Sequence, residues 1–341
     1  MLVEQNKTHT SGTATNVAVT LTGRPMLVGP NGERLTPQVV ERRILAGLGG
    51  KPWTLKDLRS ADIREAKKVW AELRTAVGFK GTTGGWVTTD KTNPKLGKAG
   101  IPTVGVTLHA ARAAAVAWTD LSATRRTAIA AAVDLSVEHL SDLLDVTVCP
   151  HATSCVEACV VDRSRNGQMD HSRRSRLLRN VLTVARPDLA LALTAEMLEQ
   201  TADKAGGRSK ARWRVNISDD IRWELVAPGL LVLSPKAYSY TKWPVAQRPG
   251  HRRLRLVYSA NERWTDQDIV DACATGHRVA VVYDCKAKQL PATWNGVRVV
   301  DGDKTDDLWS HPAGCIVGLA AKGVSHEIKE AMKSSGFSRP V

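Results

Sequence analysis

Arg278-Val-Ala-Val-Val-Tyr283 is an almost continuous apolar stretch that is followed by a polar residue, Asp284. Short runs of this kind are typical of strands in a parallel sheet that is covered on both faces. Similar runs occur at residues 213–217, 230–234, 254–259, 297–300 and 316–320. Helical patterns such as residues 266–275 separate several of them. This alternation predicts an α/β fold with a parallel sheet, closed into a full or partial (β/α) barrel.

Helical patterns dominate the chain before this sheet. Thr36 and Pro37 are typical of a helix start, and this helix is expected to run to about Gly47. A later helix is predicted after Ser60 or Asp62, and longer ones within residues 110–145 and 177–200. Residues 144–148 read as a short β-like run. The sequence thus predicts a small N-terminal arm and helical region, residues 1–100, before a barrel-like domain, residues 101–341.

Basic residues outnumber acidic residues in this chain. The 48 Lys and Arg against 34 Asp and Glu leave a net charge of +14, a balance that favours polyanionic partners. The first residues lack a signal-peptide pattern, and no apolar run is long enough to span a membrane. The cysteines show no disulfide framework. We therefore expect a soluble, cytoplasmic protein with nucleic acid as a partner and no membrane.

The stretch Cys149-Pro-His-Ala-Thr-Ser-Cys-Val-Glu-Ala-Cys159 brings three thiols within eleven residues. Cys155 and Cys159 are four residues apart, so a helical turn would place both sulfurs on one face. Pro150 keeps the chain extended after Cys149, which allows the first sulfur to fold back toward the others. This spacing predicts a metal site, whereas three separately buried cysteines are the alternative.

Two kinds of metal centre fit three local thiols. Iron–sulfur clusters are held by thiolates, and structural zinc takes four Cys or His ligands. The fourth position is either open to a substrate or filled by another residue, with His151 as the first candidate and His171 and Cys285 next. An iron–sulfur cluster is preferred to zinc.

Polar residues follow several of the predicted strands. In parallel sheets and barrels the site lies at the carboxyl ends of the strands, so these residues are expected around one mouth with the cysteines. The candidate catalytic residues are Asp220, Glu224, Glu262, Asp301, Asp303 and Lys322, with Asp219 nearby. Alternatives remain open: Asp220 and Glu224 could pair with Arg222, Asp301-Gly-Asp303 reads more readily as a turn, and Lys322 could pair with a structural carboxylate.

Arginines gather after the cysteines, with few acidic residues beside them. A basic helix next to a metal site could bind a phosphate backbone, although a solvated helix face is the simpler alternative. The candidate nucleic-acid residues are Arg163, Arg165, Arg173, Arg174, Arg176 and Arg179.

Several segments carry a family resemblance. They are the cysteine loop, residues 213–224, Tyr238-Ser-Tyr-Thr-Lys242, residues 300–306 and residues 316–323. Together they resemble a bacteriophage and actinobacterial family with a three-cysteine motif and no assigned activity, the gene-product-88-like proteins. The resemblance runs from about Thr103 to the end. Asp219 stands where this family usually has Ser. The resemblance implies a phage setting, and host cytoplasm if the protein is phage-encoded.

The cysteine loop followed by βα units is also remotely similar to radical S-adenosylmethionine enzymes, which hold a four-iron cluster by three thiolates. The spacing of five and three departs from theirs, and Asn216-Ile-Ser-Asp-Asp220 stands where they have a glycine-rich strand. This similarity implies Asn216 and Ser218 as cofactor-binding residues and S-adenosylmethionine as a companion cofactor.

Two functional hypotheses follow. The first is an iron–sulfur enzyme that acts on a nucleotide or nucleic acid at the three-cysteine cluster. The second is a non-catalytic nucleic-acid-binding protein that is stabilised by zinc, with His151 as the fourth ligand.

Overall fold

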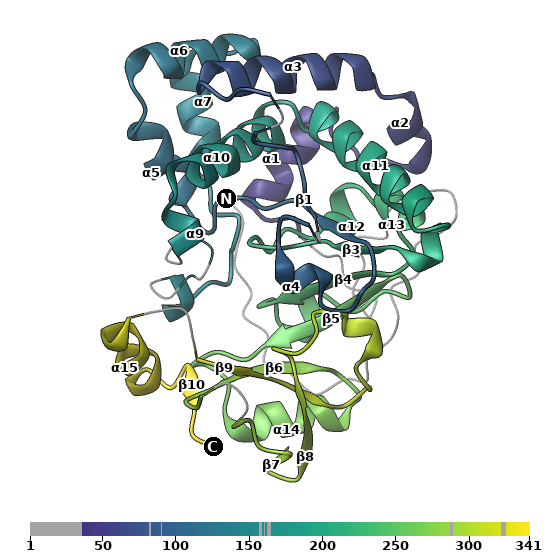
Figure 1. Cartoon of the computed structure of the whole chain (residues 1–341), viewed down its shortest axis with the longest axis vertical. Coiled ribbons are helices and arrows are strands. Elements are labelled where there is room, and N and C mark those ends of the chain that lie inside the picture. The colour runs from purple at the N-terminus through teal and green to yellow at the C-terminus, as the bar shows by residue number, and fades with distance from the viewer. Residues whose placement is uncertain are drawn as a thin grey trace, which may run out of the picture.

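The computed structural model describes residues 36–81, 83–89, 91–156, 159, 161, 165–286, 289–321 and 325–341. In these residues a ten-stranded sheet runs through the molecule in the order β1-β2-β3-β4-β5-β6-β9-β8-β7, with β10 paired to β6 (Figure 1). The strands are β1 (Thr88–Thr89), β2 (Thr103–Gly105), β3 (Arg212–Arg214), β4 (Ala237–Thr241), β5 (Leu254–Ser259), β6 (Val279–Tyr283), β7 (Thr293–Trp294), β8 (Val297–Asp301), β9 (Ile316–Ala320) and β10 (Ser338–Arg339).

The sheet is mostly parallel. Strands β2, β3, β4, β5, β6, β9 and β8 pair in parallel, whereas β1 and β7 pair antiparallel to their neighbours. The predicted α/β fold with a parallel sheet is confirmed, and β5 and β9 have the predicted bounds. Closure of the sheet into a full or partial barrel stays a prediction.

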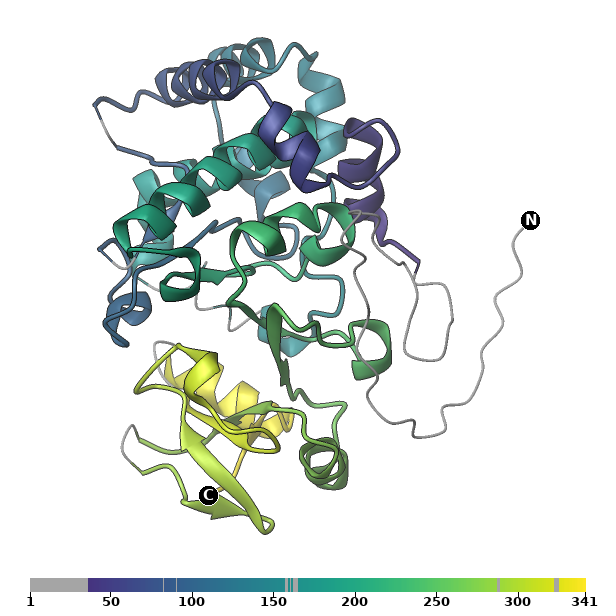
Figure 2. The same ribbon diagram turned by 90° about the vertical axis from the view of Figure 1, so that its right-hand side faces the viewer.

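Most helices of the N-terminal and middle parts gather at one end of the molecule, next to the first strands of the sheet (Figure 2). Those of the N-terminal and middle parts are α1 (Val39–Gly47), α2 (Leu55–Ser60), α3 (Ile63–Ala76), α4 (Pro94–Gly97), α5 (Ala113–Thr119), α6 (Ala123–Ala132), α7 (Val137–Leu144), α9 (Arg165–Gln168), α10 (Asp170–Ala185) and α11 (Pro187–Lys204). Those of the C-terminal part are α12 (Trp223–Val226), α13 (Gly229–Leu233), α14 (Asp266–Ala274) and α15 (His326–Ser334). Short 3-10 turns are η1 (Ser154–Val156), η2 (Arg208–Lys210), η3 (Val245–Gln247) and η4 (Leu308–Ser310).

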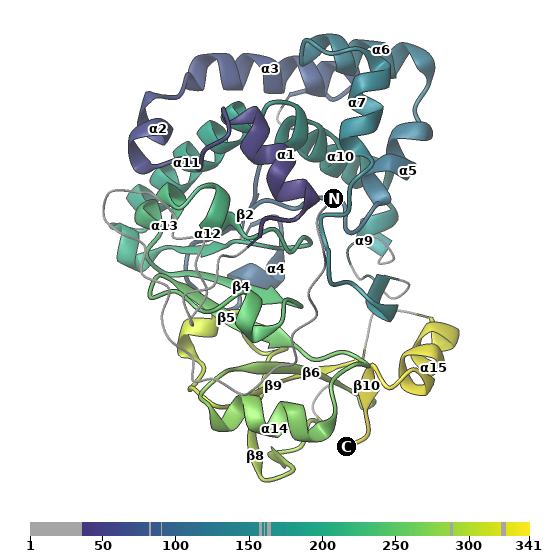
Figure 3. The same cartoon turned by 180° about the vertical axis from the view of Figure 1, so that it is seen from behind.

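The largest core lies between the helices and the first strands. Helices α10 and α11 pack against each other, α11 contacts β2, and α3 forms an outer layer on α11. Helix α1 lies on α10, as the view from behind shows (Figure 3). Apolar residues of α1 to α3 therefore share one core with α10, α11 and the strands β2 to β5. None of the helices in the described ranges combines the length and the apolar character that a bilayer span requires.

Two predicted elements have a different structure. Residues 177–200 were expected as one helix, but the chain forms α10 and α11 with a break at Arg186, because Pro187 lacks the N–H that a continuing helix needs and disfavours a helical residue before it. Residues 230–234 form α13 rather than a strand. A short apolar run that is buried on all sides shows no alternation of polar and apolar residues that would distinguish a helix from a strand.

The chain before Cys149 also differs from the prediction. Residues 110–145 are largely helical, as predicted, and hold three helices, whereas residues 145–148 form no strand. Helix α7 ends at Leu144, and Val148 is held by single backbone bonds, from its N–H to Ala111 O and from Asp220 N–H to its carbonyl. The cysteine loop therefore follows a helix and an irregular segment.

Candidate functional site

The cysteine loop crosses the carboxyl ends of β3 to β5. The Cys149 thiol donates to the carbonyl of Ser218 at 3.4 Å, and the N–H of Asp220 donates to Val148 O at 2.8 Å. Both partners follow β3. Farther along the loop, Glu262, which follows β5, accepts a hydrogen bond from the N–H of Ser154 at 3.0 Å. The loop is thus fastened to the carboxyl edge of the sheet at its start and at its middle.

Glu262 is the predicted site residue with the clearest role. Its carboxylate also accepts from the hydroxyls of Thr153 at 2.9 Å and Ser154 at 3.0 Å. Burial raises the pKa of this carboxyl, but the Ser154 N–H and the two hydroxyls outweigh it, so the pKa lies below its usual value. The bonds are therefore present at neutral pH and are lost on acidification through that lowered pKa.

We expect Glu262→Ala to loosen the cysteine loop. Hydrogen bonds to a charged acceptor are the stronger kind, and three are lost, so amides of residues 151–156 should exchange with solvent about tenfold faster or more. Hydrogen exchange read by mass spectrometry measures this change. Glu330→Ala, an exposed carboxylate on α15, is the matched control. Equal exchange in both variants would contradict the anchoring role.

Lys242, directly after β4, lies close enough to the three cysteines for their charges to act on its ammonium. Burial by itself would lower the pKa of its ammonium, but Cys155, Cys149, Asp220 and Cys159 together raise it. For the Cys149 thiol, burial raises the pKa far above the usual range, while Lys242 acts in the opposite direction. At neutral pH a charged ammonium therefore sits beside protonated Cys149, and this charge favours thiolates when the thiols lose their protons.

His151 lies against the ring of Trp243, with ring centroids 4.3 Å apart. Trp243 is held from two sides: its indole N–H donates to Asp220 O at 2.8 Å, and Arg222 lies 3.8 Å over its ring. Burial lowers the pKa of His151, so its imidazole is neutral at pH 7. Its Nε2 is buried and has no hydrogen-bond partner among the described residues. A neutral imidazole with an unused nitrogen is the form that binds a metal.

The donor groups of the cysteine loop match a metal site in type but not in position. Three thiols, an unpartnered imidazole nitrogen and a compensating ammonium suit thiolate-bound metal chemically. However, the described ranges contain no group of three or more His, Cys, Asp or Glu side chains placed to hold one metal ion. The thiols thus share one charged neighbour without converging on a single point.

A buried polar network lies beneath the loop. Arg248 donates to Asp220 at 2.7 Å, to Glu224 at 2.8 and 3.0 Å, and to Asn216 Oδ1 at 3.0 Å. Asp220 also accepts from the N–H of Lys242 at 2.7 Å. Both predicted acid–base residues are therefore bound to one fully buried guanidinium. These ion pairs connect the segment that follows β3 to the segment that follows β4.

Asp219 differs from its neighbour. It accepts from Asn216 Nδ2 at 2.5 Å and from the N–H of Ile221 at 3.3 Å, and no ion pair holds its carboxyl in the described part of the chain. Burial raises its pKa to about 7, although both hydrogen bonds act in the opposite direction. Near neutral pH this buried carboxyl is close to half protonated.

The predicted cofactor residues are engaged within the protein. Asn216 uses its amide nitrogen for Asp219 and Ile221, and its oxygen accepts from Ser239 at 2.7 Å and from Arg248. The Ser218 hydroxyl donates to Leu108 O at 2.6 Å. Each side chain would have to exchange an internal bond for one to a ligand.

Asp301 and Asp303 shape the turn after β8. Asp301 Oδ1 accepts from the N–H groups of Asp303 at 2.9 Å and Lys304 at 3.2 Å, and Asp303 Oδ2 accepts from Ala320 N at 3.1 Å. This is the turn that the Asp-Gly pattern favoured. Strand β8 is three places from β5 in the sheet, so its turn lies farther along the same edge. Lys322 lies outside the described residues.

The comparisons with known proteins give one match. The model of the family "Gene product 88" matches residues 89–338, which is most of the chain. The chain belongs to this family. No curated protein and no solved structure matches. The matched region of this family member includes the cysteine loop, Lys242, Arg248 and Glu262, and the similarity to radical S-adenosylmethionine enzymes stays a prediction.

The arginines after the cysteines divide into two groups. Arg176 and Arg179 of α10 are buried, and Arg179 donates to Gly85 O at 2.6 Å and to Thr107 O at 3.1 Å. Arg176 donates to Gly167 O. These two guanidiniums connect α10 to nearby chain segments and do not form a surface. Arg173 pairs with Asp120 at 2.6 Å, and Arg174 pairs with Asp170 at 2.6 Å.

Of the other two predicted nucleic-acid residues, Arg163 and the side chain of Arg165 lie outside the described residues.

Sequence reasoning missed two residues that organise this family's loop region. Lys242 had only a weak signal, because the strand before it, Ala237-Tyr-Ser-Tyr-Thr241, is not an apolar run. Arg248 had no such signal, because it lies in an irregular segment 28 residues from its partner Asp220. Only the folded chain brings its guanidinium under the loop.

Proposed function

We propose that this protein binds an iron–sulfur cluster through Cys149, Cys155 and Cys159, and acts with it on a nucleotide or nucleic-acid substrate. The observation that carries the proposal is the contact of the three-cysteine loop with the carboxyl edge of a parallel sheet, through the Cys149 thiol to Ser218 O and the Ser154 N–H to Glu262. This edge is where α/β proteins place their ligands. The net charge of +14 fits a phosphate-bearing substrate.

The cluster is preferred to a single zinc ion because of the spacing of the thiols. Zinc needs its thiolates about 2.3 Å from one point, and the described residues bring no three such donors together. The thiolates of a cluster bind separate irons and need no common point. When bound by three thiolates, a cluster leaves one iron open to a substrate or cofactor, including S-adenosylmethionine.

The chain's own residues have separate tasks in this proposal. Lys242 supplies a positive charge that offsets the thiolates. Glu262 holds the loop over β5, and Asp220 holds the loop start through Val148 O. Arg248 forms buried ion pairs with Asp220 and Glu224. Asp219, with its pKa near 7, is the group suited to exchange a proton at this edge.

The second candidate is a zinc-stabilised nucleic-acid-binding protein without catalytic activity. The unpartnered, buried Nε2 of His151 favours it, because this nitrogen could complete a four-ligand site. The three thiols would have to move toward one another for zinc to bind.

Metal analysis of protein purified without oxygen tests both candidates. We expect brown protein with about four irons per chain, and Cys155→Ala should lose most of the iron and the colour. Cys273→Ala, a cysteine of α14 that is buried in the core against β6, should keep both. Colourless protein with one zinc that His151→Gln loses would support the second candidate, and protein without either metal would contradict both.

A further inference from the structure

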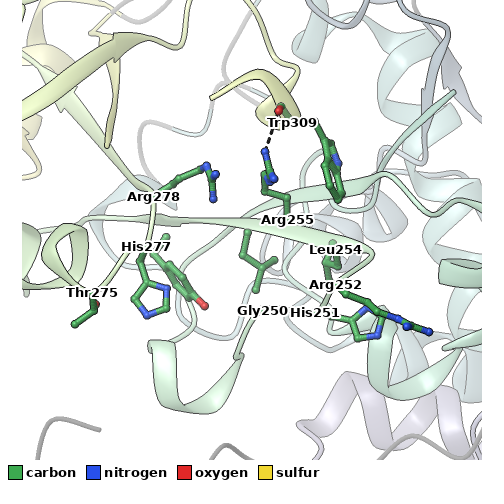
Figure 4. Close-up of a pocket in the computed structure, with 12 residues that line it drawn as sticks. Gly250, His251, Arg252, Leu254, Arg255, Thr275, His277, Arg278 and Trp309 are labelled. Carbon is green, nitrogen blue, oxygen red and sulfur yellow. Dashed lines mark hydrogen bonds between the residues drawn. The ribbon is translucent and has the colours of Figure 1, made fainter. Parts of the chain in front are cut away.

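A polar cavity lies at the opposite edge of the sheet from the cysteine loop. It has a volume of about 300 Å³ and is lined by the segments that precede β5 and β6, by residues of β5 and by η4 (Figure 4). Its charged, imidazole and indole side chains are those of His251, Arg252, Arg255, His277, Arg278 and Trp309. None of its lining residues carries a carboxylate.

The two guanidiniums at its centre are fixed on one side only. Arg255 lies 4.3 Å over the ring of Trp309, and its Nη1 donates to Trp309 O at 2.9 Å and to Leu308 O at 3.3 Å. Arg278 donates to His311 O through Nε at 3.1 Å and Nη2 at 3.0 Å. Within the described chain, Arg255 Nε and Nη2 and Arg278 Nη1 have no acceptor. These donors are held in place and remain available to a ligand.

No carboxylate of the described residues neutralises the positive charge of this cavity. Neither Arg255 nor Arg278 forms an ion pair with a described residue. The nearest carboxylate that acts on Arg255 is Asp307, but its oxygens bind Arg212 at 3.0 and 3.4 Å. Burial and the neighbouring Arg255 both lower the pKa of Arg278. Two like charges held side by side without a counter-charge are stabilised by a bound anion.

We propose that this cavity binds the phosphate or pyrophosphate group of a small phosphorylated molecule. Guanidinium forks match the oxygens of phosphate, and two of them suit a dianion. The volume is at the lower end of the range for small-molecule sites. Arg255 already covers a face of Trp309, so the ring is poorly placed to stack a base. The site lies away from the carboxyl ends of the strands and does not depend on the proposed metal function.

Calorimetric titration of the full-length protein with inorganic pyrophosphate tests this site. We expect saturable binding of one pyrophosphate per chain that weakens as salt rises. Arg255→Gln/Arg278→Gln should weaken binding about tenfold or more, since charge-assisted bonds are lost. Arg59→Gln/Arg64→Gln, with the same charge change on exposed positions of α2 and α3, should leave it unchanged.

A second variant covers the case in which the double variant does not fold. Arg252 is exposed and makes no internal side-chain bond with a described residue, so Arg252→Gln should fold and weaken binding severalfold. No binding to the unaltered protein at millimolar pyrophosphate would overturn the site. Unchanged pyrophosphate affinity in both Arg252→Gln and a folded double variant would overturn it as well. Competition by a 5′-phosphorylated oligonucleotide, but not by the same strand without that phosphate, would identify a nucleic-acid end as the natural source of the phosphate.

Discussion

Arg248→Met is expected to destabilise the protein by about 3–5 kcal/mol, the usual cost of removing one partner of a buried ion pair. Arg248 is completely buried and binds Asp220, Glu224 and Asn216. Methionine fills similar space but leaves two buried carboxylates without a cation. Because Asp220 also holds the start of the cysteine loop, the loop should open first. Urea unfolding followed by circular dichroism measures the loss.

The same network allows a matched rescue experiment. Arg248→Met combined with Asp220→Asn and Glu224→Gln removes all three charges, so no unpaired charge stays buried and much of the lost stability should return. Arg252→Met, at an exposed position four residues later, is the control and should change the unfolding free energy by about 0.5 kcal/mol or less. Equal stability of Arg248→Met and Arg252→Met would contradict the role of the network.

Asp219→Asn is expected to stabilise the protein relative to the unaltered chain as pH rises. Burial raises the folded pKa of Asp219 to about 7 from an ordinary value of 3.8. Between these values the folded protein keeps a proton that the unfolded chain releases, so the stability that this group contributes falls with rising pH, by up to about 1.4 kcal/mol per pH unit. Above pH 7 the folded protein must hold a buried carboxylate. Asparagine keeps the acceptor for Asn216 and Ile221 and avoids this charge.

Urea unfolding at pH 5, 6, 7 and 8 measures the effect. The unfolding free energy of Asp219→Asn minus that of the unaltered protein should increase by about 3 kcal/mol across this range. Asp203→Asn, an exposed position near the end of α11, should give a difference that does not change with pH. A pH-independent difference for Asp219→Asn would mean that this carboxyl is ionised throughout.

Much of the fold could be predicted from local patterns. The apolar runs of β5 and β9 and the helix α14 between strands have a length and period that identify them. The errors have local physical causes as well. Pro187 divides a continuous amphipathic pattern into α10 and α11, and α13 is too short and too buried to show a period. The segment before Cys149 looked β-like, but in the structure it has no strand partner among the described residues.

The candidate site was predicted in part. The position of the cysteines beside Asp220 and Glu262 follows from the rule that parallel strands end at one edge. The roles of these residues did not follow from it. Asp220 and Glu224 are bound by Arg248, and Arg179 donates to a backbone carbonyl. These bonds form because burial requires every charged group to find a partner. That requirement depends on neighbours in space, which residue spacing does not specify.

The sequence by itself determined the α/β class, the three-cysteine loop and the positive charge, since these depend on residue type and on separations of a few residues. Only the tertiary structure decided that Lys242 lies close to the thiols, that Arg248 binds two predicted acid–base residues, and that Arg255 and Arg278 face a cavity without a carboxylate. Each of these involves side chains from different strands or loops. Electrostatic interactions between such groups depend on distance and burial, and both are set when the strands pair and the core excludes water.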